Sequence, residues 1–318
     1  MDLKTVLTLV AVVLAAIPSV PMDATGAHKE FDVLAIFAFG DSLGDAGTNS
    51  FIPQASARAD FLPCGKTFFR KPTGRFTNCR TVVDFTAQKL DLPLTPPFLK
   101  PHASFTKGVN FASGGRGLLD STSADDFSVR MSTQVQQFAS AKATLEKQLG
   151  AHSAGILTFK SIVLFTSGSN GHRVRRWSAG CSPLARASNT AKQGECVEVA
   201  NQLALGFNAA LKQLVDGLRA ALPRFNLVLA NSFDTVSAMI TDGKSFGLDN
   251  VTAACCGAGF LNAKVQCGKP DFCRRPFKSL FWDVLHPTEH VNWILLNVLF
   301  TCDATAAYPI NSRALARL

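Results

Sequence analysis

The sequence predicts an α/β protein, a three-layer α/β/α sandwich with a central parallel sheet. Short runs of mostly apolar residues are typical of parallel strands that helices cover on both faces. Segments with apolar residues at helical spacing lie between these runs, and strands that alternate with helices favour a layered α/β fold. The predicted strands are 33–39, 108–112, 162–166 and 226–230, and the clearest predicted helices are 80–90, 199–222 and 291–300.

Each of these elements has its own support in the sequence. The first, third and fourth strands are mostly apolar rather than alternating, whereas the second is shorter. The helix 199–222 stops before Pro223, which cannot continue a helix. The segment 291–300 is apolar but short and contains two asparagines, which favours a core helix over a membrane span.

The beginning of the chain has the order of an export signal. Lys4 precedes an apolar run from Val6 to Ile17, and small residues follow up to Ala27. Such a run is too short to cross a bilayer but suits the core of a signal peptide; a buried N-terminal helix is the alternative. We expect residues 1–27 to be a signal peptide and residues 28–318 to form a single domain, because no repeat, low-complexity region or linker divides them.

The charge and the cysteines narrow the class of protein further. The formal net charge is +9, but Lys and Arg are scattered and form no basic stripe with aromatic residues, which argues against nucleic acid as a partner. Nine cysteines in an exported chain favour disulfides over a metal site, and their odd number leaves at least one thiol unpaired. Four of them, from Cys255 to Cys273, predict a stapled loop, in which no Cys-x-x-Cys spacing supports zinc. The sequon Asn250-Val251-Thr252 predicts a glycosylated surface loop.

Polar and glycine-rich turns follow three of the predicted strands. These turns are 40–45, 110–115 and 167–171. Because ligands of such sheets bind beyond the carboxyl ends of the strands, the turns place a serine hydroxyl, a glycine amide and a carboxamide on one rim. Each turn alone could be an ordinary connection, but the combination indicates a site.

A serine hydroxyl becomes a good nucleophile only when a base takes its proton, so a histidine held by a carboxylate is expected. Among six histidines, His286 has an acid three residues before it, Asp283, a spacing of about one helical turn. This spacing could let Asp283 hold the Nδ1 hydrogen while Nε2 faces Ser42. Taken alone, the pair would more often be a surface or capping pair. A metal pair of His286 with His290 is a further alternative, but it lacks a third ligand.

Four blocks in this order carry a resemblance to a known family: 39–43, 110–115, 168–170 and 283–288. The chain resembles the SGNH hydrolases, and most closely the plant GDSL esterase/lipase family. Further support comes from 72–78, 180–183 and 255–257, so that the likeness spans nearly the whole mature chain. Ordered blocks are far more specific than a single Gly-Asp-Ser-Leu.

The resemblance implies an SGNH or flavodoxin-like fold and roles for five residues. Ser42 attacks the ester carbonyl, His286 takes its proton and returns it to the leaving alkoxide, and Asp283 orients the ring. The amides of Ser42 and Gly115 and the side chain of Asn170 form the oxyanion hole. The family uses no metal or organic cofactor, and the implied location is extracellular, in the cell wall or apoplast.

Two features depart from the family pattern. Gly171 stands where relatives carry Asp, and only ten residues separate Asn170 from Cys181, where relatives carry a helix and a central strand. An average helix of roughly 11 residues and a strand of roughly 5 do not fit there. Either the sheet is rebuilt with a gap and lacks one central strand, or the chain is an exon-skipped or misannotated form. A stub strand at 174–177 would not replace the helix, so we expect exposed apolar surface.

The leading functional prediction is a secreted serine ester hydrolase that acts on esters of lipids, small acyl esters or acetylated glycans. The alternative is a catalytically weak or inactive binding protein on the same scaffold. The complete set of Ser42, Asp283 and His286 favours the enzyme, and the short segment after Asn170 favours the alternative.

Overall fold

The computed structural model describes residues 30–122, 127–166, 170, 179–222, 226, 228–268, 272–301 and 306–318. The predicted signal peptide and the predicted stub strand at 174–177 lie outside these described residues.

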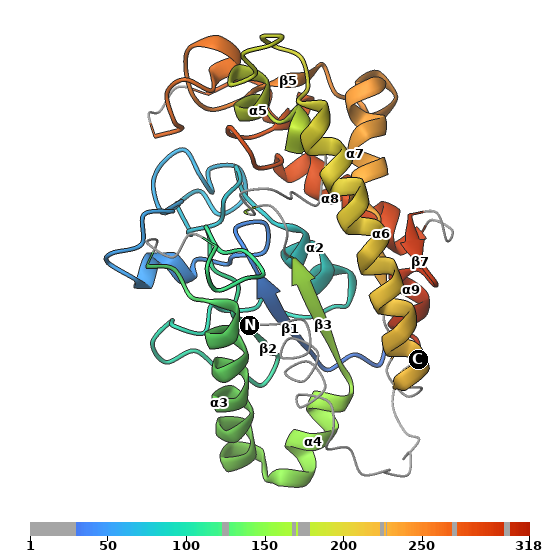
Figure 1. The fold of residues 1–318 in the computed structure, drawn as a ribbon. Coiled ribbons are helices and arrows are strands. Elements are labelled where there is room, and N and C mark those ends of the chain that lie inside the picture. The colour runs from blue at the N-terminus through green and yellow to red at the C-terminus, as the bar shows by residue number, and fades with distance from the viewer. Residues whose placement is uncertain are drawn as a thin grey trace.

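A parallel sheet of three strands forms the centre of the molecule (Figure 1). Its order is β2-β1-β3, so that β1 pairs with a parallel neighbour on each side. Every residue of β1 is buried, as its apolar sequence predicts. The bounds are β1 Ala35–Gly40, β2 Gly108–Asn110 and β3 Ser161–Thr166.

Helices cover both faces of this sheet. Alternate residues of β1 point to opposite faces, with Ile36 and Ala38 on one and Phe37 and Phe39 on the other. The first face packs against α2 and α8, and the second packs against α3 and α4. The predicted three-layer α/β/α sandwich is therefore confirmed. The bounds are α2 Val82–Lys89, α3 Met131–Leu149, α4 Ala151–Phe159 and α8 Glu289–Thr301.

The other elements form a second group beside the sheet (Figure 1). Strands β5 and β6 pair in parallel, and the two-residue strands β4 and β7 pair antiparallel. The helices are α5 Pro183–Ala187, α6 Glu198–Ala221, α7 Ser232–Thr241 and α9 Ser312–Leu315, and the strands are β4 Leu229–Ala230, β5 Asn250–Ala254, β6 Ser279–Phe281 and β7 Ala307–Tyr308. Short 3-10 helices lie at Thr48–Phe51, Ala179–Cys181, Gly243–Phe246, Phe260–Asn262 and Pro276–Lys278.

The fourth predicted strand does not join the central sheet. Among the described residues of this segment, Leu229 and Ala230 form β4, which pairs with β7 in a separate sheet. The backbone of β4 pairs instead with β7 near the end of the chain, and the ten residues between Asn170 and Cys181 are too few for a helix and a further strand next to β3. As expected, apolar surface is left open: Val163 and Phe165 of β3 are 45% and 44% exposed.

Three disulfides confirm the prediction from the cysteines. Two of them staple the loop that follows β5, and the third closes the segment before α6; they join Cys255–Cys273, Cys256–Cys267 and Cys181–Cys196. Free thiols among the described residues are Cys64 and Cys79, both buried.

The sequon lies in a strand rather than in the predicted loop, and its Thr252 is exposed. Asn250 begins the strand β5 and is half-buried. Its side-chain nitrogen, the atom that a glycan would modify, donates a hydrogen bond to the Ala253 carbonyl (2.9 Å). A short strand beside β6 replaces the loop because the backbone of this segment pairs with the strand leading to Asp283.

None of the helices in the described part of the chain has the length and apolar character that a membrane crossing requires.

Candidate active site

The site begins at the turn that follows β1. Gly40 has a φ of 136°, and a Cβ added there would lie 1.7 Å from the Thr166 carbonyl oxygen, so only glycine fits beside the end of β3. Beyond it, the Asp41 carbonyl accepts hydrogen bonds from the amides of Gly44 and Asp45 (both 3.1 Å). This tight turn holds Ser42 at the carboxyl edge of the sheet, 4% exposed.

The structure brings Ser42, His286 and Asp283 together. The Nε2 atom of His286 lies 2.7 Å from Ser42 Oγ, and its Nδ1 atom lies 2.8 Å from both carboxylate oxygens of Asp283. The ring of Phe76 packs against the imidazole, with centroids 5.1 Å apart. A hydroxyl, an imidazole and a carboxylate in this line can activate the hydroxyl for nucleophilic attack.

The Asp-x-x-His spacing works because it closes a tight turn. Asp283 Oδ1 accepts hydrogen bonds from the amides of Leu285 (2.9 Å) and His286 (2.8 Å), and the Trp282 amide donates to the His286 carbonyl (2.7 Å). The same carboxylate thus shapes the backbone and orients the ring.

The charges of Asp283 and His286 shift the pKa of each other. Burial works against the charged form of Asp283, but the positive charge and the hydrogen bonds of His286 outweigh it and hold the pKa of the carboxyl below its usual value. Burial likewise works against a protonated His286. The Asp283 carboxylate outweighs it, with help from the charge of Asp41, so the pKa of the imidazole is raised.

Two segments brace the histidine turn from outside. Thr77 Oγ1 donates to the Pro287 carbonyl (3.0 Å), and Asn78 Oδ1 accepts from the Glu289 amide (2.8 Å). These contacts give a structural role to the segment 72–78, which sequence analysis linked to the family without assigning it a function.

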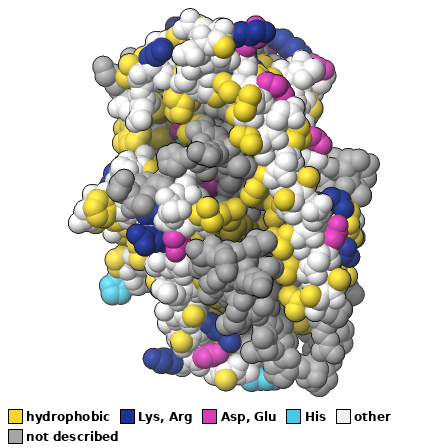
Figure 2. Space-filling model, in the orientation of Figure 1, with side chains coloured by type: hydrophobic (Ala, Val, Ile, Leu, Met, Phe, Trp, Pro, Cys, Tyr) yellow, Lys and Arg dark blue, Asp and Glu magenta, His cyan; other side chains and the backbone are white. Residues whose placement is uncertain are grey.

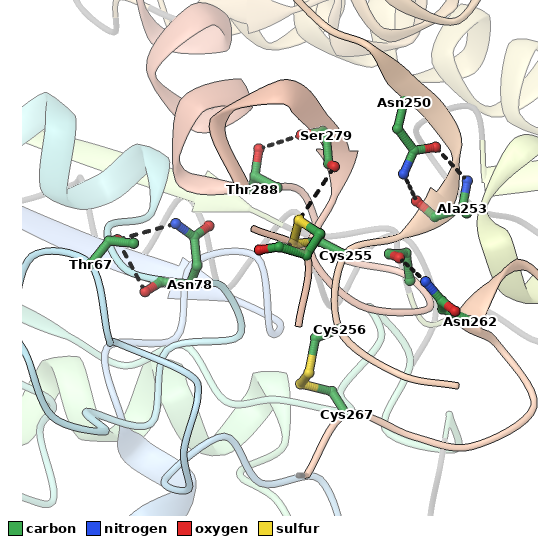
Figure 3. Close-up of a disulfide and its surroundings, with 12 residues drawn as sticks. Thr67, Asn78, Asn250, Ala253, Cys255, Cys256, Asn262, Cys267, Ser279 and Thr288 are labelled. Carbon is green, nitrogen blue, oxygen red and sulfur yellow. Dashed lines mark hydrogen bonds between the residues drawn. A yellow bond between two sulfur atoms is a disulfide. The ribbon is translucent and has the colours of Figure 1, made fainter. Parts of the chain in front are cut away.

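The disulfide-stapled segment forms the second brace (Figure 3). The Cys256 amide donates to the Trp282 carbonyl (2.7 Å), one residue before Asp283. The Cys256–Cys267 disulfide lies next to this contact, and Thr288 Oγ1 donates to the Ser279 carbonyl (2.8 Å) at the start of β6. Covalent cross-links therefore lie directly behind the strand that delivers Asp283 and His286.

The two predicted oxyanion-hole residues lie close to each other in the fold. Gly115 has a φ of 86°, and the Asn170 side-chain nitrogen donates to the carbonyl of the next residue, Arg116 (3.1 Å). The neighbouring Gly114 amide donates to Asp45 Oδ2 (2.9 Å), three residues after Ser42. Hydrogen bonds thus connect Asn170, the Gly115 turn and the serine turn.

Asp45 holds these turns together from a fully buried position. Its Oδ1 atom accepts from the amides of Gly47 (2.7 Å) and Thr48 (2.6 Å), in addition to the bond from Gly114. Burial raises the pKa of Asp45 to about 6, although the three amides and the nearby Arg75 oppose the shift.

Sequence analysis missed a buried glutamine that holds the end of β1. Gln134 of α3 accepts from the Gly40 amide and donates to the Gly40 carbonyl, both at 2.9 Å. Gln134 lies on the same buried face of α3 as Phe138 and Leu145. A polar residue among the apolar positions of a helix is the sequence pattern that could have indicated this role.

A buried ion pair is the second residue set whose role sequence analysis missed. Arg75 makes two 2.7 Å hydrogen bonds to the carboxylate of Asp84, in the first turn of α2, and donates to the Ala46 carbonyl (3.1 Å). It therefore ties the loop after Ser42 to the helix that supports the sheet.

The metal alternative for His286 receives no support. His286 Nε2 is bonded to Ser42, and the ring of His290 stacks on Trp293 instead. The described residues contain no group of three or more metal-ligating side chains.

Comparison with known proteins gives a consistent family. The model of the GDSL-like lipase/acylhydrolase family matches residues 36–170 and 170–297. The chain is 31% identical to GDSL esterase/lipase 6 of Arabidopsis thaliana, over 91% of this chain and 92% of that protein. It is also 31% identical to GDSL esterase/lipase 7 of the same plant, over 89% of this chain and 92% of that protein.

These matches also locate the shortened segment. The two parts of the family match meet at Asn170. The alignment with GDSL esterase/lipase 6 has 340 positions, more than the 318 residues of the chain, so it contains gaps in this chain. The resemblance to the plant GDSL esterases/lipases is confirmed, and with it the prediction of a carboxylic ester hydrolase: the chain belongs to the GDSL-like lipase/acylhydrolase family.

Proposed function

We propose that this protein is a secreted serine ester hydrolase that cleaves carboxylic esters by a Ser-His-Asp mechanism. The observation that carries the proposal is the continuous line of hydrogen bonds from Ser42 Oγ through the His286 ring to Asp283, with distances of 2.7 and 2.8 Å. Each atom lies where general base catalysis requires it, because proton transfer needs heavy atoms about 2.6–3.2 Å apart.

The first half of the reaction forms an acyl-enzyme. Ser42 Oγ attacks the ester carbonyl carbon while His286 Nε2 takes its proton, which gives a tetrahedral oxyanion. The Ser42 and Gly115 amides and the Asn170 side chain donate to this oxyanion. The intermediate then collapses, the C–O bond to the alcohol breaks, and His286 returns the proton to the leaving alkoxide.

The second half regenerates the enzyme. Water attacks the acyl-enzyme while His286 takes its proton, and the collapse of the second tetrahedral intermediate releases the carboxylic acid and Ser42. Asp283 stays ionised throughout, because its pKa is held low, and it stabilises the imidazolium that forms in each step.

Export and domain organisation belong to the same proposal. Residues 1–27 act as the signal peptide, and residues 28–318 form one catalytic domain. Three disulfides support an oxidising compartment such as the cell wall or apoplast. The proposed substrates are esters of lipids, small acyl esters or acetylated glycans, and the Arabidopsis relatives are named esterases/lipases.

One observation favours a second candidate, an inactive binding protein on the same scaffold. The segment after Asn170 is short, and the outer strand β3, which leads to Asn170, is partly uncovered.

Labelling and turnover decide between the two candidates. We expect the purified mature protein to hydrolyse p-nitrophenyl acetate and to react with a fluorophosphonate probe, and the Ser42→Ala variant to do neither while keeping its fold. Absence of both activities in the folded native protein would support the binding protein. Labelling of Ser42→Ala at normal strength would rule out Ser42 as the nucleophile.

A further inference from the structure

One face of β3 forms an apolar strip that the described protein leaves open. Val163 and Phe165 are 45% and 44% exposed, whereas Ile162 and Leu164 point to the opposite face and join the core with α2 and α8. Half-exposed apolar side chains on a strand of the central sheet are unusual, because strands of parallel sheets are normally covered on both faces.

Helix α3 covers the same face of the neighbouring strand β1. Val163 and Phe165 lie beside Phe37 and Phe39 in the register of β1 and β3. Phe138 of α3 packs against both of these β1 residues, with ring centroids 5.1 and 5.8 Å apart, and so buries the β1 part of the face. Only ten residues separate Asn170 from Cys181 after β3, too few for an average helix of roughly 11 residues followed by a strand.

The strip lies on the strand whose end contacts the turn of the proposed nucleophile. Strand β3 runs parallel to β1 and ends beside it at Thr166, whose carbonyl accepts from the Asp41 amide (2.8 Å), next to Ser42. Phe165 lies one residue before this contact, and Val163 lies about 7 Å further down the strand. Figure 1 shows the two strands side by side. In the same orientation, Figure 2 shows hydrophobic side chains spread among polar ones over this face of the molecule.

The chemistry of the strip selects one kind of occupant. The side chains on this face of β3 are Ser161, Val163 and Phe165, so it carries no charge and only one hydroxyl. A sugar or a charged headgroup would gain little there. An alkyl chain would gain roughly fourfold in binding for each methylene group that leaves water.

We propose that the open face of β3 binds the acyl chain of the substrate, so that this enzyme prefers esters of medium or long fatty acids. The inference rests on the proposed function, because it extends a substrate outward from the carbonyl carbon that Ser42 attacks.

The test compares acyl lengths in variants of the strip. Val163→Thr keeps a β-branched residue in the strand, and Phe165→Ser removes the larger apolar side chain. Phe159→Ser is the matched control, because Phe159 is 58% exposed but lies at the end of α4, beyond the other end of β3. For each protein, kcat/KM is measured with p-nitrophenyl octanoate and p-nitrophenyl acetate, and the fold is checked by circular dichroism.

We expect the native protein to favour the octanoate by about tenfold or more, in line with the gain for each buried methylene. The ratio should fall at least about fivefold in Phe165→Ser, and less in Val163→Thr, because less apolar area is lost. It should stay unchanged in Phe159→Ser. An equal ratio in all four proteins would overturn the inference while leaving the esterase proposal intact.

Direct binding keeps the test independent of turnover. Octanoate is titrated into the full-length mature protein by calorimetry, and we expect Phe165→Ser to weaken its binding at least about fivefold relative to native and Phe159→Ser. If the native protein hydrolyses neither ester but binds octanoate in a way that depends on Phe165, the esterase proposal is rejected and the proposal of an alkyl-binding face on β3 is retained. If octanoate binds the native protein and Phe165→Ser equally well, the proposal that β3 binds the acyl chain is rejected.

Discussion

The Nε2 atom of His286 lies 2.7 Å from the Oγ atom of Ser42, although 244 residues separate the two in the chain. Two turns from different parts of the fold meet at this contact. The serine turn is held by the end of β3, and the histidine turn is held by the disulfide-stapled strand β5 and by Thr77. The proposed catalysis therefore depends on how these supports are joined, and the following changes test that dependence.

The acid of the triad should matter through the tautomer it selects. Asp283→Asn should lower kcat by about 10⁴-fold, the loss that this change causes in serine proteases, and His286→Ala should remove nearly all turnover. Steady-state kinetics with p-nitrophenyl acetate measures both. Asp283 also accepts hydrogen bonds from two backbone amides, so its replacement could affect folding, and thermal melting serves as the control. A loss below tenfold for Asp283→Asn would make this Asp structural.

The side chain of Asn170 should act mainly on the transition state. Its amide donates to a substrate oxygen whose charge develops during the reaction, so Asn170→Ala should lower kcat by roughly 10²–10³-fold with a smaller change in KM. Full kinetic curves for the native protein and the variant separate the two parameters. A change in KM alone would assign Asn170 to binding of the ground state.

Activity should fall on the acid side as His286 gains a proton, because only the neutral imidazole can take the proton of Ser42. The Asp283 carboxylate raises the pKa of His286, so the acid limb of kcat/KM should lie above the ordinary histidine value of about 6.5. Replacing Asp283 with Asn should move the limb of the residual activity to lower pH. A pH profile of both proteins is the measurement, and an unmoved limb would mean that another group titrates.

The ion pair between Arg75 and Asp84 should contribute to stability well beyond a surface pair. Arg75→Met leaves the buried Asp84 carboxylate without its partner, and breaking a buried pair costs about 3–5 kcal/mol of unfolding free energy. The control is Lys192→Ala, which removes an exposed pair with Glu195 and should cost less than about 1 kcal/mol. Urea unfolding compares the two variants with the native protein. Equal small losses would show that the Arg75 pair contributes no more than a surface pair.

The shortened segment should make the chain less stable than a longer form. We expect that inserting a family-like helix and strand after Asn170 raises the melting temperature and the soluble yield, and lowers the binding of a dye for apolar surfaces. The physical reason is that Val163 and Phe165 would be covered and the open edge of β3 would be paired. Equal behaviour of the two forms would show that the short connection is a working solution.

The sequence by itself determined the local elements and the identity of the candidate site. The apolar runs at 33–39 and 162–166 became β1 and β3, because residues of a central parallel strand are apolar on both of its faces. Only β1 is buried on both faces, since one face of β3 is open. Asp283 and His286 were found because their spacing is local and because the ordered blocks resemble a known family. The short distance from Asn170 to Cys181 also predicted the open apolar face.

Only the tertiary structure decided which distant segments meet. Residues 226–230 look like a central strand, but β4 pairs with β7, since strand pairing depends on the neighbour available in space and not on composition. The contacts of Gln134 with Gly40 and of Arg75 with Asp84 and Ala46 are likewise invisible in the sequence. A buried polar side chain is stable only with a partner, and the folded chain alone determines which partner comes within hydrogen-bonding distance.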